Sequence, residues 1–222
     1  MPSAADLPAA VQGDMTRSRL LAPARLALGA LTIAAVIAQY AHRANPSAFY
    51  TVNYFSFFTN ESNLFATALL LYGAYLGLRR GGGERSSLYD LLRGAAVIYM
   101  TITGAVFVLL LSPSHEAVPW ANAVVHYGMP IVIVLDWLLD PPRARITWRR
   151  ATRWLIFPAV YFGYTLIRGA IVGWYPYPFL NVTVHGYGGV VANGVGILVA
   201  MAAVSSATLL LGNRLHARFR TA

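Results

Sequence analysis

Apolar runs of about 20 residues, separated by short segments that hold the charges, dominate this 222-residue chain. Each run is long enough to cross about 30 Å of hydrocarbon as an α-helix. Charged residues make up only 11% of the chain, against 57% hydrophobic residues, whereas soluble domains carry about 25% charged residues. The pattern therefore predicts an all-α protein whose helices lie in a membrane.

Six runs satisfy this length, and they cover residues 21–42, 55–78, 91–112, 121–139, 154–174 and 186–212. We expect a bundle of six transmembrane helices over residues 21–212, without a soluble domain. Residues 1–20 are polar and rich in Ala and Pro, and they lack the apolar core of a signal peptide. They are predicted to form a disordered cytoplasmic tail, and residues 213–222 a basic cytoplasmic tail.

The basic residues indicate the orientation of the spans. All 17 are arginines. All but Arg43 and Arg168 lie before or at the start of the first run, between the second and third runs or at the start of the third, between the fourth and fifth, or after the sixth. Because loops rich in basic residues stay in the cytoplasm, both termini are predicted to be cytoplasmic. The absence of lysine, with high Ala and Gly, is typical of a GC-rich bacterial genome, so we expect a bacterial plasma membrane.

The net charge of +9 also suits anionic lipid headgroups, and no nucleic-acid-binding motif accompanies it. We therefore expect membrane lipids as partners and no nucleic acid. The chain has no cysteine and five histidines, and these histidines lack the spacing of metal ligands. We expect neither a metal nor a cofactor, and the sequence does not indicate an oligomeric state.

Polar residues inside the second run form one stripe. Ser56, Thr59, Asn60, Asn63 and Thr67 follow the spacing of one helix face, which must face the bundle interior because burial in lipid is expensive. Hydrogen bonds between helices would explain the stripe equally well.

The fourth run has a matching stripe with Asn122 and His126 one turn apart, and Asp136 and Asp140 further toward the cytoplasmic end. Pro130 cannot donate to the carbonyl of His126, so this carbonyl is expected to be free and the helix to kink. For the two aspartates the alternative is ion pairing with the arginines of residues 143–153.

Two further residues are expected near the same membrane depth. Arg168 in the fifth run either extends to the interface or binds an acidic group, such as Glu61 or a ligand carboxylate. His185 precedes a glycine-rich start of the sixth run. The orientation places Thr59, His126, Arg168 and His185 together in the outer half of the membrane, which favours a site over scattered packing contacts.

A threonine hydroxyl needs an adjacent general base to act as a nucleophile, and a neutral histidine is the usual base. Thr59 and His126 could form such a pair, with Asn122 orienting the imidazole. Asn60, Asn63 or Arg168 could stabilise an oxyanion.

Two alternatives remain open. The same polar cavity could serve a non-enzymatic binder or transporter of a small lipid-like or anionic molecule, with Arg168 as anchor. The polar stripes could also be packing contacts of a structural membrane protein.

Three short motifs add a resemblance. An aromatic segment ends in Phe58-Thr59 at the head of the second run. The second motif is Trp120-Ala121-Asn122, with His126 four residues after the asparagine and Asp136 ten residues after the histidine. The third motif is the run WYPYPFL at residues 174–180.

In their order and spacing these motifs resemble the androgen-induced-gene / androgen-dependent TFPI-regulating-protein family. The resemblance covers the second to sixth spans. It implies six-span membrane threonine hydrolases that cleave fatty acid esters of hydroxy fatty acids, with Thr59 as nucleophile and His126 as catalytic histidine. The polar run at residues 60–63 replaces a more apolar stretch of the family, so the resemblance implies a lipid ester hydrolase but leaves its substrate open.

Overall fold

The computed structural model of the protein describes residues 9–42, 47–79, 85–111 and 118–221. Within these ranges every regular element is helical, so the predicted all-α class is confirmed. Residues 1–8 of the predicted tail, and Arg43, lie outside the described residues.

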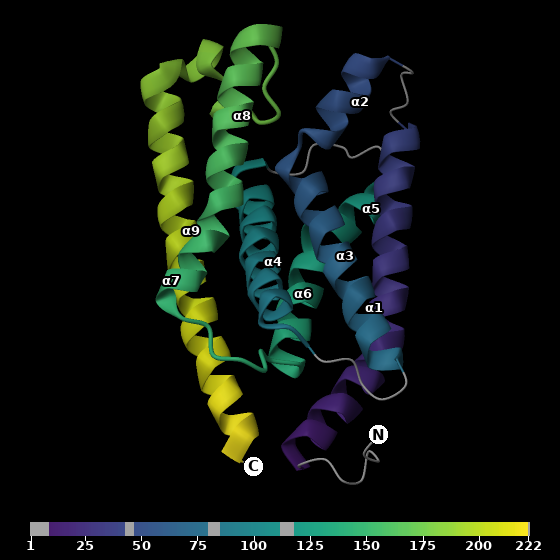
Figure 1. The fold of residues 1–222 in the computed structure, drawn as a ribbon. Helices are drawn as coiled ribbons and strands as arrows, with labels where there is room; N and C mark the ends of the chain where they lie inside the picture. Colours follow the sequence, from purple (N-terminus) through teal and green to yellow (C-terminus); the bar gives the residue numbers. More distant parts are fainter. Residues whose placement is uncertain (1–8, 43–46, 80–84, 112–117, 222) are drawn as a thin grey trace.

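In chain order the elements are α1 (Ala9–His42), α2 (Ala48–Phe55), α3 (Phe58–Leu78), α4 (Ser87–Val106), the π-helical turn η2 (Phe107–Leu111), α5 (Pro119–Ala123), the π-helical turn η3 (Val124–Gly128), α6 (Met129–Leu139), α7 (Trp148–Ala151), the 3₁₀ turn η4 (Thr152–Leu155), α8 (Ile156–Val172), the 3₁₀ turn η5 (Pro178–Leu180) and α9 (Val182–Thr221). The long helices run side by side as a bundle (Figure 1).

Five continuous helical stretches are long and apolar enough to cross a membrane, as expected of a multi-pass membrane protein. They cover Gln12–His42, Ser87–Leu111, Pro119–Leu139, Trp148–Val172 and Val182–Arg218, and they correspond to the first and the third to sixth predicted spans. The predicted second span, α3, has 21 residues but is not among the five, because the polar residues of its first turns lower its mean hydropathy.

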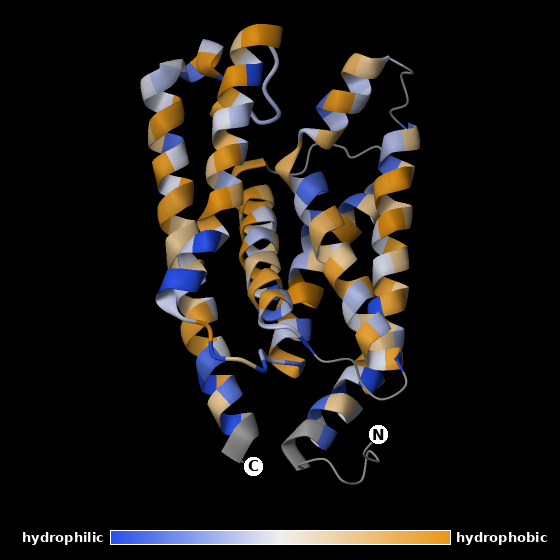
Figure 2. Cartoon of the chain, viewed as in Figure 1, coloured by the Kyte–Doolittle hydropathy of each residue, from blue (hydrophilic) through white to orange (hydrophobic). Residues whose placement is uncertain are grey.

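The bundle has two distinct ends. The first turns of α1 and the last turns of α9 lie at one end, here called the terminal end, whereas α2 and the connection between α8 and α9 lie at the other, here called the loop end (Figure 1). Figure 2 shows hydrophobic residues along the middle of α1 and α9, and hydrophilic residues on the last turns of α9 at the terminal end. This distribution is the one expected of helices that cross an apolar layer.

Helix α4 forms the centre of the bundle. In its most apolar stretch 56% of the residues are buried, against 22% in α8 and in α9. Small residues allow this close packing, since a Cβ on Gly94 would lie 2.5 Å from Cζ2 of Trp154. The Trp154 indole donates to the carbonyl of Leu91 over 2.7 Å, and the Tyr99 hydroxyl donates to the carbonyl of Trp154 over 2.8 Å.

The prediction of a disordered tail is wrong for residues 9–20, which form the first turns of α1. Ser18 of this stretch is buried at the terminal end, where its hydroxyl donates to Asp140 over 3.3 Å, so this part of α1 packs against the bundle. The basic C-terminal segment is also helical, since α9 extends to Thr221.

Two glycines shape the chain from the end of α8 to the first turns of α9. Gly173 ends α8 with a left-handed φ of 67°, and Gly186, with φ 65° and ψ 168°, interrupts the helix at the predicted start of the sixth span. Such φ values favour glycine because it has no Cβ. Between them, the carbonyl of Phe179 accepts a 2.9 Å hydrogen bond from the Asn193 amide. The segment is thereby held against α9.

Candidate functional site

Two cavities share part of their walls. The polar cavity measures about 330 Å³ and is lined among others by Thr59, Asn60, Asn122 and His126. The apolar cavity measures about 280 Å³ and is lined mainly by aliphatic and aromatic residues of α4, α8 and α9. Thr59, Leu111 and Tyr177 line both cavities, so a molecule that occupied both would pass beside the Thr59 hydroxyl.

Thr59 is the second residue of α3, where backbone N–H groups have no partner within the helix. Its N–H donates instead to the Tyr177 hydroxyl over 3.2 Å, and its own Oγ1 lies 3.3 Å from the same hydroxyl. Both residues are buried. The tyrosine hydroxyl therefore satisfies a backbone N–H group in the first turn of α3 and fixes the position of the threonine.

His126 lies in η3, with its ring stacked on Phe107 of η2 at a centroid separation of 3.8 Å and an interplanar angle of 18°. Its Nδ1 lies 3.3 Å from the backbone carbonyl oxygen of Asn122. A carbonyl only accepts hydrogen bonds, so Nδ1 carries the proton and a neutral imidazole presents the lone pair of Nε2. The predicted orienting role of Asn122 therefore belongs to its backbone and not to its side chain.

Pro130 is accommodated by a π-helical turn. The N–H of Met129 donates to the carbonyl of Val124, five residues earlier. Helix α4 packs closely against this turn at Gly104. A Cβ on Gly104 would lie 3.2 Å from the Pro130 ring and 3.3 Å from the carbonyl oxygen of His126. Single π-helical turns are frequent at functional sites, and both such turns in the described chain carry cavity residues.

The two asparagines of α3 have different roles. The Asn60 amide lines the polar cavity and donates to the carbonyl of Tyr54 over 2.7 Å. The Asn63 amide donates to the carbonyls of Thr59 and Val125, over 2.8 and 3.1 Å, and lines neither cavity. Asn63 thus joins α3 to η3 through its amide, as the alternative of interhelical hydrogen bonding predicted.

The other two predicted members lie elsewhere. The guanidinium of Arg168 donates to Asn53 of α2 and lies 5.2 Å from the ring centroid of Trp174. His185 is exposed at the start of α9. Neither residue lines the two cavities, so the structure does not bring them to the cavities that Thr59 and His126 line. A depth in the membrane specifies height along the bundle but not the direction in which a side chain points.

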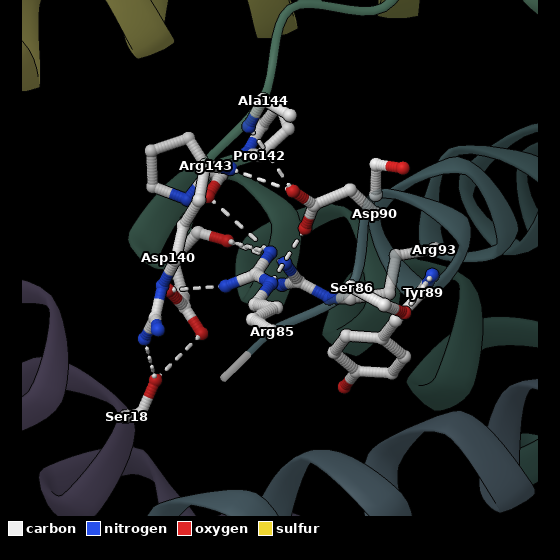
Figure 3. A network of polar contacts seen from close by, with 12 residues as sticks. Ser18, Arg85, Ser86, Tyr89, Asp90, Arg93, Asp140, Pro142, Arg143 and Ala144 are labelled. Carbon is white, nitrogen blue, oxygen red and sulfur yellow. Dashed lines mark hydrogen bonds and ion pairs between the residues drawn. The ribbon is translucent and has the colours of Figure 1, made fainter. Parts of the chain in front are cut away.

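The aspartates of the fourth run belong to a separate network of ion pairs at the terminal end. Figure 3 shows the part of this network around Asp140. Asp140, only 1% exposed, accepts hydrogen bonds from Arg25 over 2.7 Å and from Arg85 over 2.8 Å. Asp136 accepts from Arg25 and Arg93, both over 2.6 Å. The alternative of pairing with the arginines of residues 143–153 is therefore wrong for these carboxylates, because α1 and α4 bring closer guanidinium groups.

The electrostatics of this network are dominated by its arginines. Burial would raise the pKa of Asp140, but the guanidinium groups of Arg85, Arg93 and Arg25 outweigh burial and hold it below its usual value. Arg85 also pairs with the buried carboxylate of Asp90 at the start of α4. The network fastens α1, α4 and α6 together and lies apart from the two cavities.

Sequence analysis did not single out Tyr177 and Phe107 as members of the site. Tyr177 belongs to an aromatic run whose composition suits the headgroup level of a membrane, and Phe107 lies in an uninterrupted apolar run. Two signals were present in the sequence. Tyr177 belongs to the motif at residues 174–180, and Asn193, a polar residue in the sixth span, anchors the segment that carries Tyr177.

The described side chains contain no group of three or more His, Asp or Glu residues arranged to hold a metal ion. In comparisons with known proteins, no family model, no curated protein and no solved structure matches this chain.

Proposed function

We propose that this protein is a membrane lipid ester hydrolase with Thr59 as nucleophile and His126 as general base. The observation that carries the proposal is the position of Thr59 on the wall common to both cavities. The apolar cavity suits an acyl chain, and the polar cavity, which holds the imidazole, suits an ester group. The resemblance of the three sequence motifs favours the same reaction.

In the proposed reaction, Oγ1 of Thr59 attacks the ester carbonyl carbon while Nε2 of His126 takes the hydroxyl proton. The new O–C bond forms as the carbonyl π bond opens to an oxyanion. Collapse of this intermediate breaks the ester bond, and the leaving alkoxide receives the proton from the imidazolium. Water then hydrolyses the acyl-threonine, with the same histidine as base. The start of α3 carries a partial positive charge that favours this developing negative charge.

The proposal includes a membrane arrangement. We infer that α3 is a sixth span that packs inside the bundle, with the terminal end in the cytoplasm and the loop end outside, in a bacterial plasma membrane. The support is the burial of the polar face of α3 and the common location of both ends of the described chain (Figure 1). Lipid would enter from the outer leaflet.

A fluorophosphonate probe tests this function. Attack by Thr59 on the phosphorus would expel fluoride and leave a stable phosphonate ester on its oxygen. We expect purified wild-type protein in detergent to be labelled, Thr59→Ser to retain labelling, and Thr59→Ala and His126→Ala to lose it. Thermal unfolding of each variant shows whether the fold is kept.

Two outcomes would overturn the proposal. If the wild-type protein fails to label, or if folded Thr59→Ala still labels, Thr59 is not an activated nucleophile. A binder or transporter would then be the better account of the two cavities. Ligand binding by two variants would test that account. Arg168→Ala should weaken binding more than Thr59→Ala only if Arg168 anchors an anion.

A further inference from the structure

The proposed reaction requires hydrogen-bond donors for the oxyanion. Of the three donors expected from the sequence, two are placed elsewhere. The Asn63 amide donates to two backbone carbonyls. The guanidinium of Arg168 contacts Asn53 of α2 and the Trp174 ring, and Arg168 does not line the cavities. The third, Asn60, donates through its amide to the carbonyl of Tyr54. The residues that face the threonine must therefore be searched for other donors.

Tyr177 presents its hydroxyl beside the threonine and between the two cavities. The hydroxyl accepts the N–H of Thr59, which leaves its single proton available for donation. Its ring is held by stacking on Phe179, at 5.2 Å and 8°, and by an edge contact with Phe57 at 5.5 Å. Burial raises the pKa of Tyr177, so the phenol keeps its proton at neutral pH.

Asn122 supplies a second polar group to the lining of the polar cavity. Its side chain is 6% exposed, and Oδ1 accepts no hydrogen bond from any residue that the structure describes. Buried amides are rarely left unpaired, because the loss of hydration costs about 1–3 kcal/mol. Oδ1 only accepts, so it cannot bind an oxyanion. The donor of this amide is Nδ2, from which no residue that the structure describes accepts a hydrogen bond, and the residue lines the polar cavity beside the proposed catalytic pair.

We propose that the Tyr177 hydroxyl and the Asn122 side-chain amide form the oxyanion-binding site of this enzyme; this inference rests on the proposed hydrolase function. In the resting protein Tyr177 can donate to Oγ1 of Thr59, 3.3 Å away. When Oγ1 bonds to the carbonyl carbon, it loses its basicity while negative charge grows on the carbonyl oxygen. The Tyr177 hydroxyl then donates to this stronger acceptor, and Nδ2 of the Asn122 amide donates to it as well.

The rate constant of fluorophosphonate labelling tests the inference, since the phosphoryl oxygen gains the same charge. Removing one oxyanion donor lowers rates by about 10²–10³-fold, so we expect this loss in Tyr177→Phe and in Asn122→Leu. The matched control is Tyr99→Phe, which removes a buried tyrosine hydroxyl that donates to the carbonyl of Trp154 outside both cavities. This control should label at the wild-type rate.

The pH profile of labelling separates oxyanion binding from positioning of the base. His126 is oriented by the backbone carbonyl of Asn122, which Asn122→Leu retains. We therefore expect the inflection of the profile to stay at the wild-type pH in both variants. A shifted inflection would show that the side chain acts on His126, and it would contradict the inference.

The two proposals fail in different ways. If folded Tyr177→Phe and Asn122→Leu label at the wild-type rate while Thr59→Ala does not label, this oxyanion site is wrong and the hydrolase stands. If the wild-type protein does not label, both proposals fail. Should one of the two variants not fold, the labelling rate of the other decides.

Discussion

At the scale of single residues, Asp140 shows how a charge is kept inside this protein. Its carboxylate is almost fully buried, but Ser18, Arg25 and Arg85 donate to it from α1 and from the segment before α4. Loss of one member of a buried ion pair leaves the remaining charges without compensation, which typically costs about 3–5 kcal/mol.

We predict this loss of unfolding free energy for Asp140→Asn in detergent. The control is Asp14→Asn, whose partly exposed carboxylate lies 3.5 Å from Arg143 and whose removal should cost about 1 kcal/mol or less. Because the folded pKa of Asp140 is lowered, its contribution is fully present above the unfolded value of about 3.9. It is lost only as the pH falls through the folded value. The difference between wild type and variant should therefore be constant from pH 7 to about 5, and a decline within that range would contradict the prediction.

At the scale of the elements, close contacts at glycines fix how the helices pack. Gly94 of α4 admits the fully buried ring of Trp154, and Gly104 admits Pro130 beside the π-helical turn that carries His126. The second contact bears on the site, since the rings of Phe107 and His126 stack just beyond it.

We predict that Gly94→Ala lowers the unfolding free energy by about 1–3 kcal/mol, the usual range for overpacking. The added Cβ would lie 2.5 Å from a buried indole, whose N–H is bonded to Leu91. The matched control is Gly163→Ala in α8, where a Cβ would meet no atom within 4 Å. Equal stability changes in the two variants would show that the contact at Trp154 does not constrain the packing.

The sequence predicted the elements better than their partners. Hydropathy located five of the spans, and the spacing of polar residues predicted the buried face of α3. The partners of Asp140 could not be predicted, because Arg25 and Arg85 lie 115 and 55 positions away in the chain. Tyr177 was missed for the same reason, as its approach to Thr59 depends on a loop that folds back between helices.

At the scale of the whole molecule, charged side chains gather at one end of the bundle and aromatic side chains at the other. The buried arginine network lies at the terminal end, and the aromatic loop with the two cavities lies toward the other. This asymmetry supports the proposed orientation with a cytoplasmic terminal end.

Single cysteines test this orientation, because the natural chain has none. Ala48→Cys at the loop end and Ala217→Cys at the terminal end are matched, exposed positions. A membrane-impermeant maleimide should label the first in intact cells and the second only after permeabilisation. The reverse pattern would place the polar cavity on the cytoplasmic side and contradict the proposed lateral access from the outer leaflet.

The most direct test of the central claim is to locate the fluorophosphonate adduct by mass spectrometry of the digested, labelled protein. The account predicts one phosphonate, on Thr59. An adduct on Ser56 or Ser62, or on any residue other than Thr59, would contradict the assignment of Thr59 as the nucleophile.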